Sequence, residues 1–303
     1  MRRFLPVFAL LACVAGCGGD DGGGGPERGT LALDFQPNAV HAGIYAADNI
    51  RIRVPSASTD SLKLLAAGRA DMSVVDIHDL GLARERGSDI VGVGALVQRP
   101  LAAVIASGSE VRRPRDLEGR RVGVTGLPSD DAVLRAVVEH DGGHFERVRR
   151  VTIGFSAVPS LIAGRVDAVV SFWNAEGVAL RERGVDTREF RVDDYGAPRY
   201  PELVLAVTRE TLDERPELVD SMLAELEKGT RAALRDRAAT IEELVRVSGA
   251  DEPLVRAQFG AVAPALTPPL RLDRDALEGW ARFDARFGIL QEPPDLRQAF
   301  RLP

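Results

Sequence analysis

The distribution of apolar residues divides the chain into an alternating part and a helical part. Up to about residue 208, short apolar runs are separated by segments of helical spacing and by turns rich in glycine and proline. Such runs are typical of buried strands, and strands that alternate with helices are typical of parallel βαβ units. We predict strands at residues 31–35, 51–54, 73–75, 90–96, 101–106, 121–125, 150–154, 168–171 and 203–208.

Beyond residue 211 the apolar positions recur every three or four residues, as at Leu218, Met222 and Leu226. This period predicts amphipathic helices, whose apolar faces pack against the rest of the protein. The predicted helices span residues 216–235, 239–247, 253–262 and 273–287. We interpret this helical tail as packing rather than chemistry.

One sequence unit occurs twice in the alternating part. The two copies are AAGRADMSVVDIHDLGLARERG (66–87) and AGRVDAVVSFWNAEGVALRERG (163–184). Both contain AGR-x-D and RERG, and they differ in the residues between these two motifs. In α/β sheets the loops after the strands face the ligand. A repeated frame with different loops therefore predicts two similar lobes that face each other across a cleft. The alternative is that two βαβ units share a common helix–strand sequence by convergence.

The N-terminus predicts export. Arg2 and Arg3 precede an apolar run at residues 4–16, which is too short for the ~20 residues that span a bilayer. The run ends in VAGC, which resembles a bacterial lipobox. We predict a lipoprotein signal peptide at 1–17, lipidation of Cys17 and a glycine-rich tether at 18–29. Cys13 is the competing site, and secretion without a lipid is the alternative.

Composition excludes several classes of function. A net charge of −6 argues against a nucleic-acid partner, which favours a basic surface. Cys13 and Cys17 are the only cysteines, so the folded part offers neither a disulfide nor a thiolate metal site. His140 and His144 lie at a predicted helix end and turn rather than on one face. We therefore expect no metal.

Four stretches resemble the NMT1/THI5-like family of ABC-transporter solute-binding proteins, which is related to thiamine-pyrimidine synthase. They are LALDFQPNAVHAGIYAA (31–47), AAGRADMSVVD (66–76), FWNAEG (172–177) and YGAPRYPELVLAVTRETL (195–212). The resemblance extends from residue 31 to about 287. The chain departs from the family after Tyr45, because its predicted first helix is shorter than the first helix that is usual in the family.

The resemblance implies an α/β, two-lobed type II periplasmic-binding-protein fold with the ligand cleft between the lobes. Lobe 1 is expected at residues 30–106 and 207–303, with the helical tail packed on it, and lobe 2 at 107–206. Hinges are expected at 106–107 and 205–208. The implied protein is a monomer, lipid-anchored on the extracytoplasmic face of the cell membrane, that delivers a small molecule to ABC permease subunits.

A thiamine-precursor aminopyrimidine is the ligand that the family implies. Its amino group and ring nitrogens require polar partners, and its two faces suit aromatic rings. Glu176 matches the amino group or a protonated ring, although a glutamate at a helix start also stabilises the helix dipole. Trp173 offers a ring face or core packing, and Asn38 offers a ligand contact or a helix cap. The predicted ligand-binding residues are Asp34, Phe35, Asn38, His41, Tyr45, Asp76, His78, Trp173, Asn174, Glu176 and Tyr195.

Three other functions are alternatives to the binding of an aminopyrimidine. The same transport role could serve a sulfonate, nitrate or riboflavin-type ligand, but an anion site favours arginine without a nearby carboxylate such as Glu176. A purely structural surface lipoprotein would have no cleft. The related pyrimidine synthase uses a lysine-bound pyridoxal phosphate, and this chain offers only Lys63 and Lys228. We therefore expect no enzyme and no cofactor.

Overall fold

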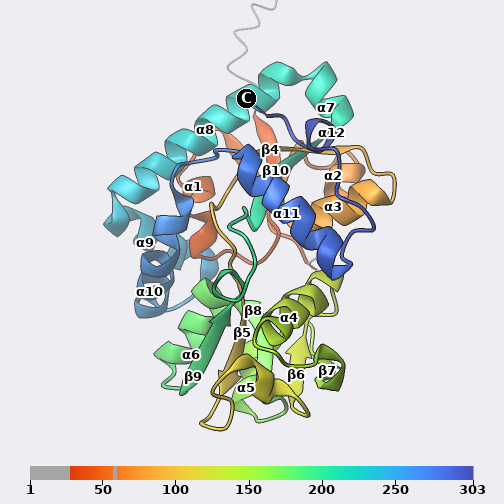
Figure 1. Cartoon of the computed structure of the whole chain (residues 1–303). Coiled ribbons are helices and arrows are strands. Elements are labelled where there is room, and N and C mark those ends of the chain that lie inside the picture. Colours follow the sequence, from red (N-terminus) through yellow and green to blue (C-terminus); the bar gives the residue numbers. More distant parts are fainter. Residues whose placement is uncertain (1–27, 57–59, 303) are drawn as a thin grey trace, which may run out of the picture.

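The computed structural model describes residues 28–56 and 60–302. The predicted signal peptide, Cys17 and all but the last two residues of the tether lie outside the described residues. The described chain forms two five-stranded sheets, one in each of two lobes (Figure 1). Among the described residues, no helix combines the length and the apolar character needed to cross a bilayer.

The sheet of lobe 1 has the strand order β2-β1-β3-β10-β4. Strands β1, β2 and β3 pair in parallel, whereas β10 runs antiparallel to both β3 and β4. The strands are β1 (Gly29–Ala32), β2 (Ile50–Arg53), β3 (Met72–Asp76), β4 (Ile90–Ala95) and β10 (Leu203–Thr208).

The sheet of lobe 2 repeats this plan in the order β7-β6-β8-β5-β9. Here β5 runs antiparallel to β8 and β9, and β6, β7 and β8 are parallel. The strands are β5 (Ala102–Ser107), β6 (Arg121–Val124), β7 (Arg149–Thr152), β8 (Ala168–Phe172) and β9 (Thr187–Arg191). The sequence did not predict β9, because TREFR carries a single apolar residue, Phe190.

The two copies of the repeated unit occupy equivalent places in the two sheets. The first copy supplies β3 and the helix after it, and the second supplies β8 and the turn and helix after it. Both β3 and β8 hold third place in their sheets, next to a strand from the other half of the chain. The prediction of two similar lobes is therefore confirmed, although each sheet is mixed rather than wholly parallel.

The chain passes between the sheets twice, at residues 96–101 and 192–202. Residues 102–106 pair with β8 and β9 and so lie in lobe 2, and residues 203–206 pair with β3 and β4 in lobe 1. Both crossings thus precede the boundaries expected from the sequence. The sequence could not place them, because β4 and β5 are equally apolar and buried over nearly their whole length.

Helices cover both sheets. They are α1 (Ala42–Tyr45), α2 (Asp60–Ala66), α3 (Ile77–Glu85), α4 (Pro128–His140), α5 (Ala157–Ile162), α6 (Val178–Glu182), α7 (Arg209–Glu214), α8 (Pro216–Arg235), α9 (Arg237–Ser248), α10 (Glu252–Val262), α11 (Arg274–Phe287) and α12 (Leu296–Ala299). Among the tail helices, α8 and α9 pack on lobe 1 through α1, whereas α10 also contacts α6 and α11 contacts α4. The tail therefore packs on lobe 1 and reaches lobe 2 as well.

The first helix is as short as the sequence predicted, and it packs closely on α8. Its single turn follows a 3-10 turn at Ala39–His41. A Cβ atom at Gly229 of α8 would lie 2.3 Å from the Gly43 carbonyl oxygen, so the two backbones approach more closely than a side chain allows. This contact supports the loop before the helix, which carries Asp34 and Phe35.

We expect Gly229→Ala to destabilise the protein, because the added methyl forces α1 and α8 apart. Overpacking of this kind costs about 1–3 kcal/mol. Gly260→Ala on α10 is the matched control, since its Cβ would meet nothing within 4 Å. The control should be neutral or more stable by about 0.5–1 kcal/mol. Urea unfolding midpoints measure both, and equal midpoints for the two variants would contradict the packing argument.

Candidate ligand-binding cavity

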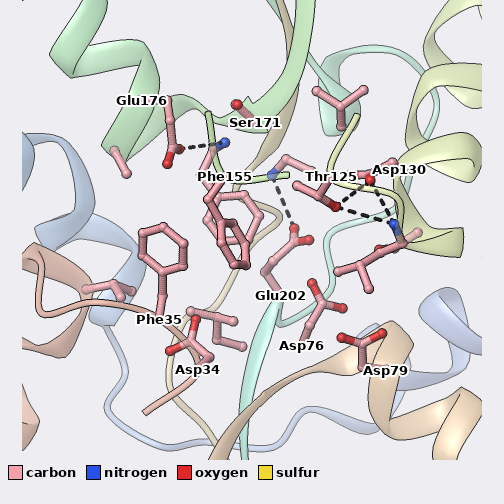
Figure 2. Close-up of a pocket in the computed structure, with 18 of the residues that line it drawn as sticks. Asp34, Phe35, Asp76, Asp79, Thr125, Asp130, Phe155, Ser171, Glu176 and Glu202 are labelled. Atoms are coloured by element: carbon pink, nitrogen blue, oxygen red, sulfur yellow. Dashed lines mark hydrogen bonds between the residues drawn. The ribbon is translucent and has the colours of Figure 1, made fainter. Parts of the chain in front are cut away.

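A cavity of about 150 Å³ lies between the two lobes. An apolar cavity of roughly this volume binds benzene, so a single six-membered ring suits its size. Residues of both lobes line it (Figure 2): Asp34, Phe35, Asn38, Val40, Ser61, Leu62, Val75, Asp76, Asp79, Glu202 and Leu203 from lobe 1 and the second crossing, and Ala102, Thr125, Leu127, Ser129, Asp130, Val133, Gly154, Phe155, Ala157, Val170, Ser171, Phe172, Asn174, Ala175 and Glu176 from lobe 2.

Two aromatic rings meet across the cavity. Phe35 comes from the loop after β1, and Phe155 comes from the loop before α5. Their ring centroids lie 4.9 Å apart at 78°, an edge-to-face arrangement between residues of opposite lobes. Phe155 is 50% exposed, so this pair stands where the cavity meets the surface. A flat ligand in the cavity would have aromatic rings beside it.

The polar wall of the cavity is acidic. Six carboxylates line it, and its lining contains no arginine, lysine or histidine among the described residues. Carboxylates accept hydrogen bonds and attract positive charge. The wall therefore favours a ligand rich in N–H donors or positively charged, and disfavours an anion. The six are Asp34, Asp76, Asp79, Asp130, Glu176 and Glu202.

Glu202 joins the cavity to both crossings. It immediately precedes β10, is 1% exposed, and its Oε2 accepts hydrogen bonds from the N–H groups of Leu101 (2.7 Å) and Ala102 (3.3 Å) at the start of β5. Burial raises the pKa of Glu202, although the charge of His78 and the two N–H groups oppose the shift. This side chain is both structural and a cavity wall.

Asp76 and Asp79 begin α3 beside Glu202. Asp76 ends β3 and caps the helix by accepting the N–H of His78 at 2.8 Å, and Asp79 lies one turn further on. Burial is the main reason that the pKa of each carboxyl is raised. Helix capping thus explains why position 76 is an aspartate. No hydrogen bond to the Asp79 carboxylate is found within residues 28–56 and 60–302, so capping does not explain Asp79.

Glu176 and Asp130 hold two loops of lobe 2. Glu176 lies in a π-helical turn (Trp173–Gly177), where its Oε2 accepts the Phe172 N–H at 3.2 Å. Asp130 accepts hydrogen bonds from the Thr125 hydroxyl (2.5 Å) and the Gly126 N–H (3.0 Å). Burial raises the pKa of both carboxyls. A π-helical turn is frequent at functional sites.

Of the residues predicted from the sequence, Asp34, Phe35, Asn38, Asp76, Asn174 and Glu176 line the cavity. The other five, His41, Tyr45, His78, Trp173 and Tyr195, do not line it. They are aromatic side chains that the structure places behind the wall or away from it.

His41 positions cavity residues from behind. It is fully buried, and its Nδ1 accepts the Asn38 N–H at 3.3 Å. Its Nε2 therefore carries the proton and donates to Asp34 Oδ1 at 2.8 Å. Asn38 lines the cavity, but its own side chain is engaged by Val40 N–H and the Gln36 carbonyl. Asn38 therefore caps the 3-10 turn, one of the two roles predicted for it, and a contact with the ligand stays a prediction.

His78 lies in the core behind Asp76 and Glu202. Its Nδ1 bonds Asp284 of α11 at 2.7 Å, and its Nε2 lies 3.2 Å from the Tyr200 hydroxyl. Burial by itself lowers the pKa of His78, but the carboxylates of Asp284, Asp76 and Glu202 raise it to about 10. The surrounding carboxylates thus favour the protonated form of His78. It brings one nitrogen within 4.8 Å of oxygens of Asp76 and Glu202, but both of its nitrogens already have partners.

Trp173, Tyr45 and Tyr195 pack elsewhere. Trp173 is 4% exposed, its Nε1 donates to the Pro100 carbonyl at 3.1 Å, and the Arg191 guanidinium lies 4.2 Å from its ring. Tyr45 faces α9, and Tyr195 contacts His140 and Phe190 edge-on. Their positions in the sequence predicted that these rings would stack on the ligand. The direction in which each side chain points depends on packing, which the sequence does not show.

Four further residues line the cavity that the sequence did not predict as ligand-binding: Asp79, Asp130, Phe155 and Glu202. For Asp79 a signal existed, because alignment of the two repeats on RERG sets Asp79 opposite Glu176. Asp130 was seen only as part of an acidic helix start. Nothing local marks Phe155 or Glu202, since their place in the cavity follows from the approach of the two lobes.

The structure is a two-lobed α/β fold with a cavity between the lobes. The chain belongs to the NMT1/THI5-like family, whose model matches residues 38–239. The family expected from the four motifs is therefore confirmed.

Three known proteins illustrate the relationship. The formylaminopyrimidine-binding protein of Halalkalibacterium halodurans is 32% identical over 71% of this chain and 68% of its own length. A 4-amino-5-hydroxymethyl-2-methylpyrimidine phosphate synthase of Legionella pneumophila is 23% identical over 90% of this chain and 91% of its own. The structure of the alkanesulfonate-binding protein SsuA from Xanthomonas axonopodis pv. citri, bound to MOPS, matches with a TM-score of 0.74 at 19% identity, covering 91% of this chain and 99% of that one. The last match confirms the fold of periplasmic binding proteins.

The favoured protonation of His78 predicts a pH dependence of stability. The pKa of His78 is about 10 in the folded protein and 6.5 for a free histidine, so its stabilising contribution is complete below about pH 6.5. It is lost as the pH rises toward about 10. We expect the melting temperature of the wild type to fall across this window. His78→Gln should melt lower at pH 6.5 and lose less on going to pH 10, whereas substitution of the exposed His140 by Gln should retain the wild-type slope. Parallel slopes for all three proteins would contradict the assignment.

Proposed function

We propose that this chain is an extracytoplasmic solute-binding protein that captures a thiamine-precursor aminopyrimidine for an ABC importer. The observation that carries the proposal is the cavity between the lobes, which suits one ring, has two aromatic rings beside it and is walled by six carboxylates. An aminopyrimidine presents a flat ring and N–H donors, which match these walls. The formylaminopyrimidine-binding relative supports the same ligand class.

The competing ligands fit the cavity less well. Sulfonates and nitrate need positive or N–H donor partners, and the described lining contains no basic side chain. The three fused rings of a riboflavin-type ligand exceed a cavity of about 150 Å³. The alkanesulfonate-binding neighbour shares the fold, but a fold hosts many ligands and the wall decides between them.

A binding role is favoured over the synthase reaction. Of the two lysines, neither Lys63 nor Lys228 lines the cavity, so the described wall offers no amine for a Schiff base. Lys228 is exposed and pairs with Asp48 at 3.0 Å. The more similar of the two curated relatives compared above is named as a binding protein, and the synthase is less similar. No cofactor is part of the proposal.

The proposed cycle uses both crossings as the hinge. Ligand enters the open cleft, and the lobes rotate about residues 96–101 and 192–202 until Phe35 and Phe155 meet beside it. In the closed form Gln258 of α10 donates to the Ala175 carbonyl of lobe 2 at 3.2 Å. We propose a monomer held at the membrane by a lipid on Cys17, from which the closed form docks on the permease.

Binding of 4-amino-5-hydroxymethyl-2-methylpyrimidine tests the proposal. A ligand at about 100 times its Kd stabilises the folded state by about 2.7 kcal/mol, so a thermal shift detects it. We expect a shift with this pyrimidine and none with taurine, nitrate or riboflavin. A shift with taurine or nitrate and none with the pyrimidine would contradict the proposed ligand class.

Glu176→Gln should weaken the binding of this pyrimidine by about 10- to 100-fold, because a hydrogen bond to a charged group is worth about 1.5–3 kcal/mol. The matched control is Glu182→Gln, which makes the same change on an exposed residue of α6 outside the cavity. Calorimetric titration measures both. Equal affinities for Glu176→Gln and the control would remove Glu176 from the site.

A further inference from the structure

Three of the six carboxylates gather on one side of the cavity. In the view of Figure 2, Glu202, Asp76 and Asp79 follow one another toward the lower right of the phenylalanine pair, and Glu176 lies above the pair. An oxygen of Asp76 and one of Glu202 lie within 4.8 Å of each other. The cavity therefore has two acidic ends, one made by Glu176 and one by this group, which we call the acidic triad.

The triad has oxygens to spare. Asp76 uses Oδ1 to cap α3, and Glu202 uses Oε2 to accept the two N–H groups at the start of β5. Within the described residues, no donor is found for Asp76 Oδ2, Glu202 Oε1 or either oxygen of Asp79. Asp76 and Asp79 are only partly buried and all three residues line the cavity, so these oxygens can accept hydrogen bonds from a ligand there.

The triad also has a surplus of negative charge. His78 supplies one positive charge behind it, but Asp284 is already bonded to that imidazolium at 2.7 Å. No basic side chain lines the cavity itself among the described residues. Burial raises the pKa of all three triad carboxyls, so it disfavours their charged forms, and a nearby cation would favour them. A cation in the cavity would correct this imbalance.

Asn174 provides an independent indication of ligand donors. It lines the cavity, is 1% exposed, and its Oδ1 has no hydrogen-bond partner in the described chain. It lies two residues from Glu176 in the same π-helical turn. A buried amide oxygen of this kind requires an N–H group, and a second acceptor beside Glu176 suits the polar edge of an aminopyrimidine ring.

On the basis of the proposed function, we infer that the ligand is a pyrimidine that carries a protonated primary amine in addition to its ring amino group. The ammonium occupies the triad, where its three N–H groups meet Asp76, Asp79 and Glu202. The ring edge faces Glu176 and Asn174, and the ring lies beside Phe35 and Phe155. The preferred ligand is thus a free aminomethylpyrimidine, not its hydroxymethyl, phosphorylated or N-formyl form.

The chemistry of the wall separates these forms. A hydroxymethyl group is neutral and has one donor for the three carboxylates. N-formylation removes the positive charge and turns a carbonyl acceptor toward carboxylates, and a phosphate ester would be repelled by them. An ammonium alone of the four matches both the charge and the number of acceptors.

Calorimetric titration of the full chain in mild detergent with each of the four pyrimidines tests the inference. We expect 4-amino-5-aminomethyl-2-methylpyrimidine to bind at least about 10-fold more tightly than the other three. Equal or tighter binding of the hydroxymethyl or N-formyl form would overturn the inference and leave the proposed function standing. Binding of none of the four would overturn both.

A variant isolates the charge. Asp79→Asn removes one negative charge from the triad without removing a hydrogen bond found among the described residues, and we expect it to narrow the preference for the amine over the hydroxymethyl form about tenfold. Asp213→Asn, on exposed α7, makes the same change away from the cavity and should leave the preference unchanged. An equal loss of affinity for the amine and the hydroxymethyl form would show that Asp79 does not distinguish the charged ligand from the neutral one.

A metal ion is the other cation that the triad could attract, and one arm of the test addresses it. Amine binding should be unaffected by EDTA, and zinc or magnesium alone should produce no thermal shift. Loss of amine binding in EDTA, or stabilisation by either metal, would overturn the inference in favour of a metal site.

Discussion

The burial of one carboxylate, Glu202, organises the region where the lobes join. Its Oε2 accepts the N–H groups of Leu101, the last residue of the first crossing, and Ala102, the first of β5, while Glu202 itself precedes β10. Its carbonyl oxygen accepts the N–H of Ile77 at 2.9 Å, which begins α3. Buried backbone N–H groups must have partners, so this one residue holds both crossings and the corner that presents Asp76. Glu202 also lines the cavity. One acidic group of the cavity wall is therefore a residue that the backbone of the two crossings requires.

Two buried histidines complete this arrangement from behind. His41 holds Asp34 through one nitrogen and the loop backbone through the other, and His78 links Asp284 of the tail to the carboxylates under the cavity. Neither histidine reaches the ligand space. Both orient carboxylates, and the raised pKa of His78 favours a positive charge that balances part of theirs. The tail helix α11 thereby contributes to the site through Asp284.

The repeat explains why both lobes contribute an acidic wall. Each sheet places its third strand beside an antiparallel strand from the other half of the chain, and the turn after that third strand points at the cleft. Asp79 and Glu176 occupy equivalent positions in the two copies. The alkanesulfonate-binding protein has the same fold. Within this architecture the side chains of the two turns, together with the loops beside them, make the cavity wall.

The sequence alone determined the element types, the two-lobed class and the family, because apolar periodicity and short motifs are local properties of the chain. It also identified Asp34, Phe35, Asn38, Asp76, Asn174 and Glu176, which follow strands and so lie at the cleft. Only the tertiary structure decided which strand joins which sheet, which aromatic side chains turn inward to the core, and that Asp79, Asp130, Phe155 and Glu202 share one cavity. Those outcomes depend on contacts between segments far apart in the chain. Glu202 lies a hundred residues from the Ala102 N–H that it accepts, and no local pattern records that distance.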